Sequence, residues 1–346
     1  MKIILDAMGG DNAPGAVVRG ALLAQQETDA GLLLVGRGED ILQVIKDEGL
    51  PSLPPGLEIA HASQVVGMED NPSSAIKDKP DSSIVVGLNM LAEGRGDAFV
   101  SAGSTGAVLT GATLLVKRIR GIRRAALSPI LPTERGGALL IDSGATADCT
   151  PEYLLQFACM GSLYMKHAQG IEAPRVGLLN IGAEETKGDE LRKAAHKLLK
   201  QAHEKGLIRF VGNVEARDVA FGAADVVVAD GFSGNILLKA SEGIGLYFVE
   251  LLKRMYAKNL KSKLGALLVK DGLRSFKKVL DYAEYGGAPF LGVSRPVIKA
   301  HGSSNPRAIA SSIRQAQAFA RADVTRLIAE NIEGMKLPEA EGGFPA

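Results

Sequence analysis

Short apolar runs alternate with glycine-rich turns and with segments of helical periodicity along most of the chain. Strands are predicted at residues 2–7, 32–35, 57–61, 98–101, 138–142, 176–180, 208–211 and 225–230. Helices are predicted at residues 14–27, 41–47, 83–92, 105–117, 151–167, 190–203 and 306–330. Strands that alternate with helices form right-handed crossovers, which favour a mostly parallel sheet with helices on both faces. The order of segments therefore predicts an α/β fold.

Composition and charge exclude several classes of protein. The chain has 346 residues, 46% of them hydrophobic and 23% charged, which is ordinary for a folded domain with a large core. A net charge of +1 gives no reason to expect a nucleic-acid partner. The uncharged residues 98–116 contain serines, threonines and glycines, so they suit a strand, a turn and a buried helix better than a membrane span. We expect a cytoplasmic chain.

Six polar turns follow predicted strands. They lie at residues 6–14, 101–107, 142–146, 180–188, 230–235 and 301–306. Ligands of open α/β sheets bind at the carboxyl ends of strands, and the N-terminus of a following helix favours an anion. We expect these turns to lie along one rim of one sheet and to form a pocket for a small anion. The candidate binding residues are Gly9, Gly10, Asp11, Ser104, Thr105, Gly106, Asp230, Ser233, Gly234 and His301.

Several common catalytic motifs are absent from the sequence. No G-x-G-x-x-G opens a helix and no G-x-x-x-x-G-K-[ST] occurs, which disfavours a dinucleotide site and a P-loop. No G-x-S-x-G elbow offers a serine nucleophile. Cys149 and Cys159 form no C-x-x-C pair and are interpreted as small buried residues, so neither a disulfide nor a thiolate metal site is expected.

Residues 241–285 break the alternation because they contain no convincing strand. We predict two helices joined near residues 264–270, projecting from an α/β domain of residues 1–240 and 286–333, with residues 334–346 as a disordered tail. Between Leu251 and Leu280 there are nine basic residues and one acidic residue, interleaved with leucines. Such a basic amphipathic segment suits a membrane surface or an acidic partner, and its apolar face also suits packing on a second copy of the chain. The predicted contact residues are Lys261, Lys263, Leu264, Leu267 and Leu268.

Several motifs resemble, in order, those of the phosphate acyltransferase (PlsX) family. They are DAMGGDNAP from Asp6, SAGSTGA from Ser101, LLNIGAEETKGDE from Leu178, DGFSGNILLK from Asp230, GGAPFLG from Gly286 and HGSS from His301. The resemblance covers the chain to about Ile328. Ser104 and Thr146 stand where the family usually has asparagine, and both keep a polar side chain that can cap a helix.

This resemblance implies a three-layer αβα Rossmann-like sandwich, of the isocitrate dehydrogenase and phosphotransacetylase type. It implies transfer of an acyl group from acyl carrier protein to inorganic phosphate, without a metal or organic cofactor. It also implies a homodimer, peripheral association with the membrane, and a membrane glycerol-3-phosphate acyltransferase that accepts the product. Matched by motif, Lys187 and Asn235 are the implied catalytic residues.

Three other functions remain open from the sequence. A phosphotransacetylase would use coenzyme A in place of the carrier protein. A decarboxylating dehydrogenase would need clustered metal-binding aspartates and an arginine set, which we do not find. A non-enzymatic scaffold would use the basic segment to recruit partners to a membrane.

Overall fold

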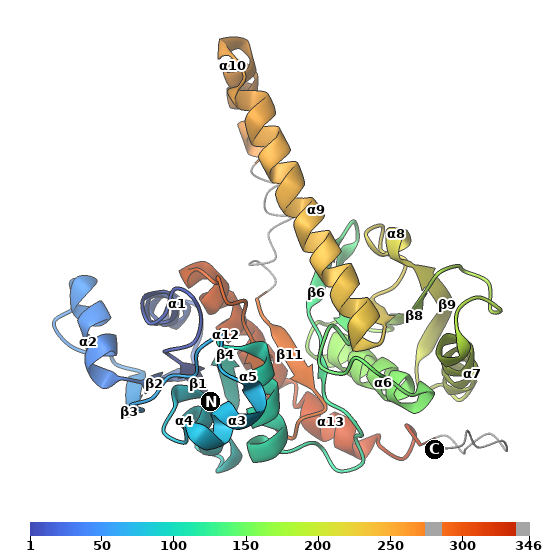
Figure 1. Cartoon of the computed structure of the whole chain (residues 1–346), viewed down its shortest axis with the longest axis horizontal. Coiled ribbons are helices and arrows are strands. Elements are labelled where there is room, and N and C mark those ends of the chain that lie inside the picture. The colour runs from blue at the N-terminus through green and yellow to red at the C-terminus, as the bar shows by residue number, and fades with distance from the viewer. Residues whose placement is uncertain (274–285, 337–346) are drawn as a thin grey trace.

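The computed structural model describes residues 1–273 and 286–336 and has the mostly parallel α/β fold that was predicted (Figure 1). Its strands form two sheets, so the expectation that all six polar turns share the rim of one sheet was wrong. The first sheet is completed by an antiparallel pairing between residues 126–127 and 290–291, which are far apart in the chain, and local periodicity does not reveal such a pairing. A single hydrophobic core nevertheless contains strand residues of both sheets, including Ile3 and Leu5 of one and Val226 and Val228 of the other.

The first sheet has seven strands among the described residues, in the order β3-β2-β1-β4-β12-β11-β5. These strands are β1 (Lys2–Asp6), β2 (Gly31–Gly36), β3 (Leu57–His61), β4 (Ala98–Ser101), β5 (Ala126–Leu127), β11 (Ala288–Leu291) and β12 (Val297–Lys299). The pairings from β3 through to β12 are parallel, whereas β11 runs antiparallel to both of its neighbours. Because β1, β4 and β12 are parallel, the turns that follow them meet at one edge.

The second sheet has five strands within the same described ranges, in the order β6-β7-β10-β8-β9. These strands are β6 (Ile130–Thr133), β7 (Gly136–Ile141), β8 (Arg175–Asn180), β9 (Arg209–Glu215) and β10 (Val226–Val228). Only β6 is antiparallel to its neighbour. The polar turns after β7, β8 and β10 therefore lie at the carboxyl edge of this second sheet.

Most helices lie close to their predicted positions. They are α1 (Gly15–Gln25), α2 (Gly38–Asp47), α3 (Pro72–Asp78), α4 (Ser83–Ala92), α5 (Thr105–Gly111), the π-helix η1 (Ala112–Val116), α6 (Pro151–His167), α7 (Glu190–Glu204), α8 (Ala216–Val219), α9 (Gly231–Ala257), α10 (Leu260–Leu268), α12 (Pro306–Arg321) and α13 (Val324–Glu330). The single helix predicted for residues 306–330 is two helices, because Asp323 has a left-handed φ of 48°. No helix of the described ranges has both the length and the apolar character to span a membrane.

A long helix, α9, rises out of the body and carries α10 at its far end (Figure 1). It starts at Gly231, ahead of the predicted start at residue 241, because Asp230 caps it. The helix α10 begins after Asn259, whose side chain accepts a hydrogen bond from the Ser262 N–H, and it ends at Leu268, within the predicted joint near residues 264–270. Residues 274–285 of the predicted projection and residues 337–346 of the predicted tail lie outside the described residues. The division into domains stays a prediction.

Candidate active site

A cavity of about 970 Å³ is lined by residues from both sheets and from α9 as far as Lys253. At one part of its wall are polar residues that follow β1, β4, β7 and β12 or lie on α9: Asp11, Thr105, Ser143, Asn235, Lys299 and His301. The remaining wall is largely apolar and comes from the β5–β6 segment and α9, with Leu127, Ile130, Leu131, Phe232, Leu246 and Val249. Mostly apolar walls with a few convergent polar groups are typical of small-molecule sites.

Five of the predicted site residues line this cavity: Asp11, Thr105, Gly106, Asn235 and His301. Asn235 is exposed to it, and its side chain makes no hydrogen bond to the described part of the chain. His301 has its Nδ1 atom 2.8 Å from the Ser303 hydroxyl. The turns predicted to form an anion site thus do meet, although they belong to two sheets.

Gly9, Gly10 and Ser104 do not line the cavity, and the glycines allow close packing behind it instead. A Cβ atom on Gly9 would lie 2.3 Å from a carboxylate oxygen of Asp6. Gly10 has a φ of 98°, and a Cβ there would lie 2.9 Å from the Gly302 carbonyl oxygen. Glycine is therefore required where the turn after β1 meets the turn after β12.

Asp142, at the end of β7, organises the turn that faces Asn235. Its buried carboxylate accepts hydrogen bonds from the backbone N–H groups of Ser143, Gly144, Ala145 and Thr146 and, 2.8 Å away, from that of Leu127. Leu127 belongs to the first sheet, so this one side chain joins the two sheets beside the cavity. The sequence analysis placed Asp142 in a polar turn but did not single it out.

The first turn of α9 packs directly on this Asp142 turn. A Cβ atom on Gly234 would lie 1.9 Å from the Asp142 carbonyl oxygen, and one on Gly231 would lie 2.6 Å from that of Thr146. Gly234, predicted to bind substrate, therefore positions α9 and with it Asn235.

Replacing Gly234 by alanine should lower the free energy of unfolding by roughly 3 kcal/mol, because the clash is with backbone that cannot rotate away. Gly243 is the matched control on the same helix, where an added Cβ meets nothing within 4 Å. Gly243→Ala should raise stability by about 0.5–1 kcal/mol. Urea unfolding of both variants checks this, and equal midpoints for the two would contradict the packing described.

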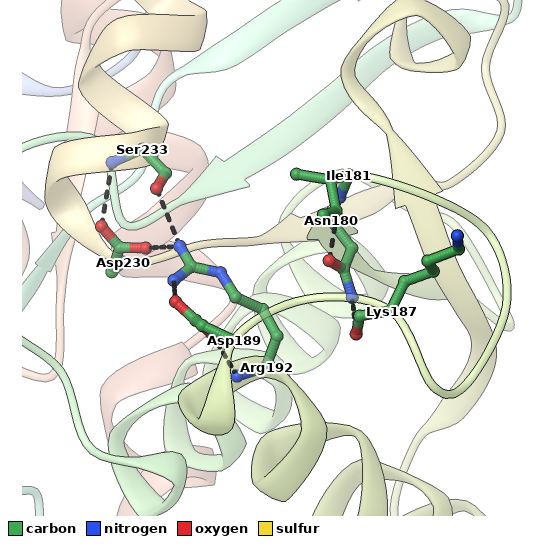
Figure 2. A network of polar contacts seen from close by, with 7 residues as sticks. All are labelled: Asn180, Ile181, Lys187, Asp189, Arg192, Asp230 and Ser233. Carbon is green, nitrogen blue, oxygen red and sulfur yellow. Dashed lines mark hydrogen bonds and ion pairs between the residues drawn. The ribbon is translucent and has the colours of Figure 1, made fainter.

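Asp230 and Ser233 belong to a polar network that anchors the start of α9 (Figure 2). Asp230 accepts a hydrogen bond from the Ser233 N–H and pairs with Arg192 of α7, whose side chain also bonds the Ser233 hydroxyl at 2.8 Å. Arg192 pairs in addition with Asp189, the N-cap of α7. These predicted binding residues therefore hold two helix starts together and do not line the cavity.

Lys187 lies apart from Asn235 in this single chain. It is exposed in the turn after β8, and Figure 2 shows its side chain directed away from Asp230 and Ser233. Its carbonyl oxygen accepts a hydrogen bond from the Asn180 side chain at 3.1 Å, which holds the end of the turn. The structure thus brings Asn235 to the cavity and leaves Lys187 outside the residues that line it.

The predicted membrane or carrier contacts do not line this cavity and lie at the outer end of the arm formed by α9 and α10 (Figure 1). Leu264, Leu267 and Leu268 are exposed there, with exposed fractions of 61%, 64% and 81%. Lys261 and Lys263 of α10 are exposed beside them.

Lys299 is the residue of the cavity wall that sequence reasoning missed. It ends β12 and is 93% buried, with 7% of its surface exposed. In the sequence it is a lone lysine at the end of an apolar run, which gives no signal of a ligand. Only the pairing of β12 with β4 brings it to the cavity.

The fold is shared with solved structures of low sequence identity. A phosphotransacetylase from Streptococcus pyogenes matches with a TM-score of 0.64 at 16% identity, covering 93% of this chain and 94% of that one. A branched-chain phosphotransacylase from Enterococcus faecalis V583 matches with a TM-score of 0.55 at 14% identity, covering 92% and 99%. The chain therefore has the phosphotransacetylase type of fold.

Sequence relatives narrow the class to one family. The model of the family described as fatty acid synthesis protein matches residues 1–327. Phosphate acyltransferases from Thermoanaerobacterium thermosaccharolyticum and Acetivibrio thermocellus are each 46% identical, over 96% and 99% of this chain and 97% and 99% of their own. The chain belongs to the phosphate acyltransferase family and is an acyltransferase, as the resemblance predicted.

Proposed function

We propose that the chain transfers a fatty acyl group from acyl carrier protein to inorganic phosphate, for phospholipid synthesis. The observation that carries this proposal is the cavity, whose polar strand ends suit phosphate and whose apolar wall suits an acyl chain. Family membership supports the same reaction.

In this reaction a hydrogen phosphate oxygen attacks the thioester carbonyl carbon. A carbon–oxygen bond forms, the carbon–sulfur bond breaks, and the proton of hydrogen phosphate ends on the departing sulfur. In the proposed reaction, Asn235 donates its amide N–H groups to the oxyanion that develops on the carbonyl oxygen. The chain then needs no nucleophile of its own. Burial raises the pKa of both Cys149 and Cys159 to about 12, so neither thiol is activated to form an acyl-enzyme.

The donor thioester is tested by supplying the same acyl group on carrier protein and on coenzyme A. Release of free thiol should depend on phosphate and should be faster from the carrier. Faster thiol release from acyl coenzyme A would indicate a phosphotransacetylase. If neither thioester releases thiol in a phosphate-dependent way, the non-enzymatic scaffold would be the remaining function.

An apolar stripe on α9 supports the proposed homodimer. Ile244, Tyr247, Phe248, Leu251 and Met255 recur at intervals of three, four and seven residues and are 46–65% exposed. That spacing is the pattern of a helix that packs against another helix. A second copy of the chain is the proposed partner, and the mass in solution by light scattering tests it.

The outer end of the arm supports the proposed peripheral contact with a membrane. Leu260, Leu264 and Leu268 are exposed at helical spacing on α10, with Lys261 and Lys263 between them. Apolar side chains that enter the lipid and lysines that meet anionic head groups suit an interfacial helix. Such a contact would deliver acyl-phosphate where a membrane glycerol-3-phosphate acyltransferase accepts it.

Replacing Leu264 and Leu268 together by glutamate should lower the partition of the protein onto anionic phosphatidylglycerol vesicles roughly 100-fold, because two leucines contribute about 3 kcal/mol. A matched double variant, Leu23→Glu with Leu42→Glu, changes two exposed leucines of the body and should float as the parent does. Undiminished flotation of the Leu264/Leu268 variant would place the membrane contact elsewhere.

A further inference from the structure

Three buried polar side chains lie side by side where β1, β4 and β12 end. In the parallel pairing of β12 with β4, Lys299 is in register with Ser101. The Ser101 hydroxyl donates a hydrogen bond to Asp6, at the end of β1, at 2.6 Å. Asp6 and Ser101 are each only 1% exposed. Of the three, Lys299 alone lines the cavity.

The ammonium group of Lys299 has no carboxylate partner in the described part of the chain. Its two hydrogen-bond partners are backbone carbonyl oxygens, those of Ala102 at 3.4 Å and of Ala300. No ion pair within 4.0 Å involves it, and Asp6 contacts Ser101 instead. An ammonium carries three donors, and a buried lysine ordinarily has a countercharge. Lys299 is therefore buried, lies on the cavity wall and has no anionic partner within ion-pair distance in the described part of the chain.

The other lysines of the cavity do not share this combination. Lys239 is exposed and pairs with Glu242 at 2.8 Å, on the next turn of α9. Lys253 is exposed further along the same helix. Desolvation lowers the pKa of Lys299 to about 8, with the charges of Asp6 and Asp11 opposing the shift, so that it is still mainly protonated at neutral pH.

We propose that Lys299 binds the attacking inorganic phosphate and supplies its countercharge at the end of β12. This rests on the proposed function, because it assigns one substrate of that reaction to a place in the cavity. An anion beside a desolvated ammonium is held far more strongly than at an exposed lysine. With phosphate at Lys299 and the thioester carbonyl at Asn235, the two reactants occupy the same cavity, one at the end of β12 and the other beside α9.

A purely structural role for Lys299 predicts a different response to substitution. If it served to stabilise Asp6, its loss would leave a buried carboxylate alone and lower the melting temperature. If it serves to bind phosphate, its desolvated charge is a cost to the unliganded fold, and a neutral side chain of similar length should be tolerated.

The test compares Lys299→Met with Lys2→Met. Lys2 is the first residue of β1, at the amino end of that strand in the same sheet, and it forms an exposed ion pair with Glu58. The KM for phosphate should rise about 10–100-fold in Lys299→Met, and the KM for acyl carrier protein should not change. Melting temperature is measured with increasing inorganic phosphate, without acyl donor, at an ionic strength held constant with chloride. The parent and Lys2→Met should be stabilised by phosphate, and Lys299→Met should not.

A folded Lys299→Met enzyme with an unchanged phosphate KM and an unchanged phosphate-dependent rise in melting temperature would overturn the proposal. Lys299→Gln is the second neutral variant. If Lys299→Met fails to fold, Lys299→Gln should show the same rise in the KM for phosphate and the same loss of stabilisation by phosphate. Phosphate binding that needs Lys299, in a chain that forms no acyl-phosphate, would reject the proposed function and keep the site. If the parent forms acyl-phosphate and both neutral variants keep the parent's KM for phosphate, the proposed function would stand and the phosphate site at Lys299 would be rejected.

Discussion

Asn235→Ala should lower the rate of acyl-phosphate formation by about 100–1000-fold, because it removes a donor to the oxyanion of the transition state. The side chain is exposed to the cavity and makes no hydrogen bond to the described residues, so the fold should lose little when it is shortened. The effect should fall on kcat, with KM values for both substrates nearly unchanged. Steady-state kinetics together with the urea midpoint separate this from a loss of folded protein.

The matched control is Asn89→Ala, which shortens an exposed asparagine on α4, away from the residues that line the cavity. It should leave both rate and stability within experimental error. An Asn235→Ala enzyme that is folded and retains the rate of Asn89→Ala would remove Asn235 from the mechanism.

Lys187→Ala is expected to reduce acyl-phosphate formation by a similar factor without unfolding the protein. The family motif assigns it to catalysis, while in the single chain it lies exposed outside the cavity wall. Because the side chain makes no ion pair within the described ranges, removing it breaks no ion pair. Stopped-flow measurement of thiol release checks the rate.

Lys193→Ala serves as the control for Lys187, since Lys193 is an exposed lysine of the adjacent helix α7 paired with Glu190. Lys187→Arg keeps the charge and should recover part of the activity. Full activity of a folded Lys187→Ala enzyme would show that the motif assignment does not apply here.

Local segments of the fold were predictable where pattern and boundary signals coincide. The predicted bounds of α4, α6 and β4 agree with the structure, because local signals set them: Ser82 caps α4, Pro151 begins α6 and a glycine turn follows β4. The break at Asp323 was missed because the helical pattern continues through it. The division into two sheets was missed because β5, β6 and β11 are short strands without a clear sequence pattern, and because β5 pairs antiparallel with β11, far away in the sequence.

The candidate site was predictable in part for the same reason. Polar turns after apolar strands identified Asp11, Thr105 and Asn235, which do line one cavity. Lys299 could not be found this way, because its importance comes from burial and from strand register. Gly234 and Asp230 were predicted to bind substrate, yet their contacts show that they position α9. A motif therefore identified the residues of the region without separating those that touch the cavity from those that support it.

Direct attack of phosphate on the thioester can be distinguished from an acyl-enzyme route in one experiment. The enzyme is incubated with acylated carrier protein, first without phosphate and then with it, while free thiol and acyl-phosphate are quantified and the enzyme's mass is recorded. If phosphate attacks the thioester directly, no thiol is released and the enzyme gains no acyl mass until phosphate is present. Thiol and acyl-phosphate then form in equal amounts. A burst of thiol before phosphate is added, together with an acylated enzyme, would contradict it.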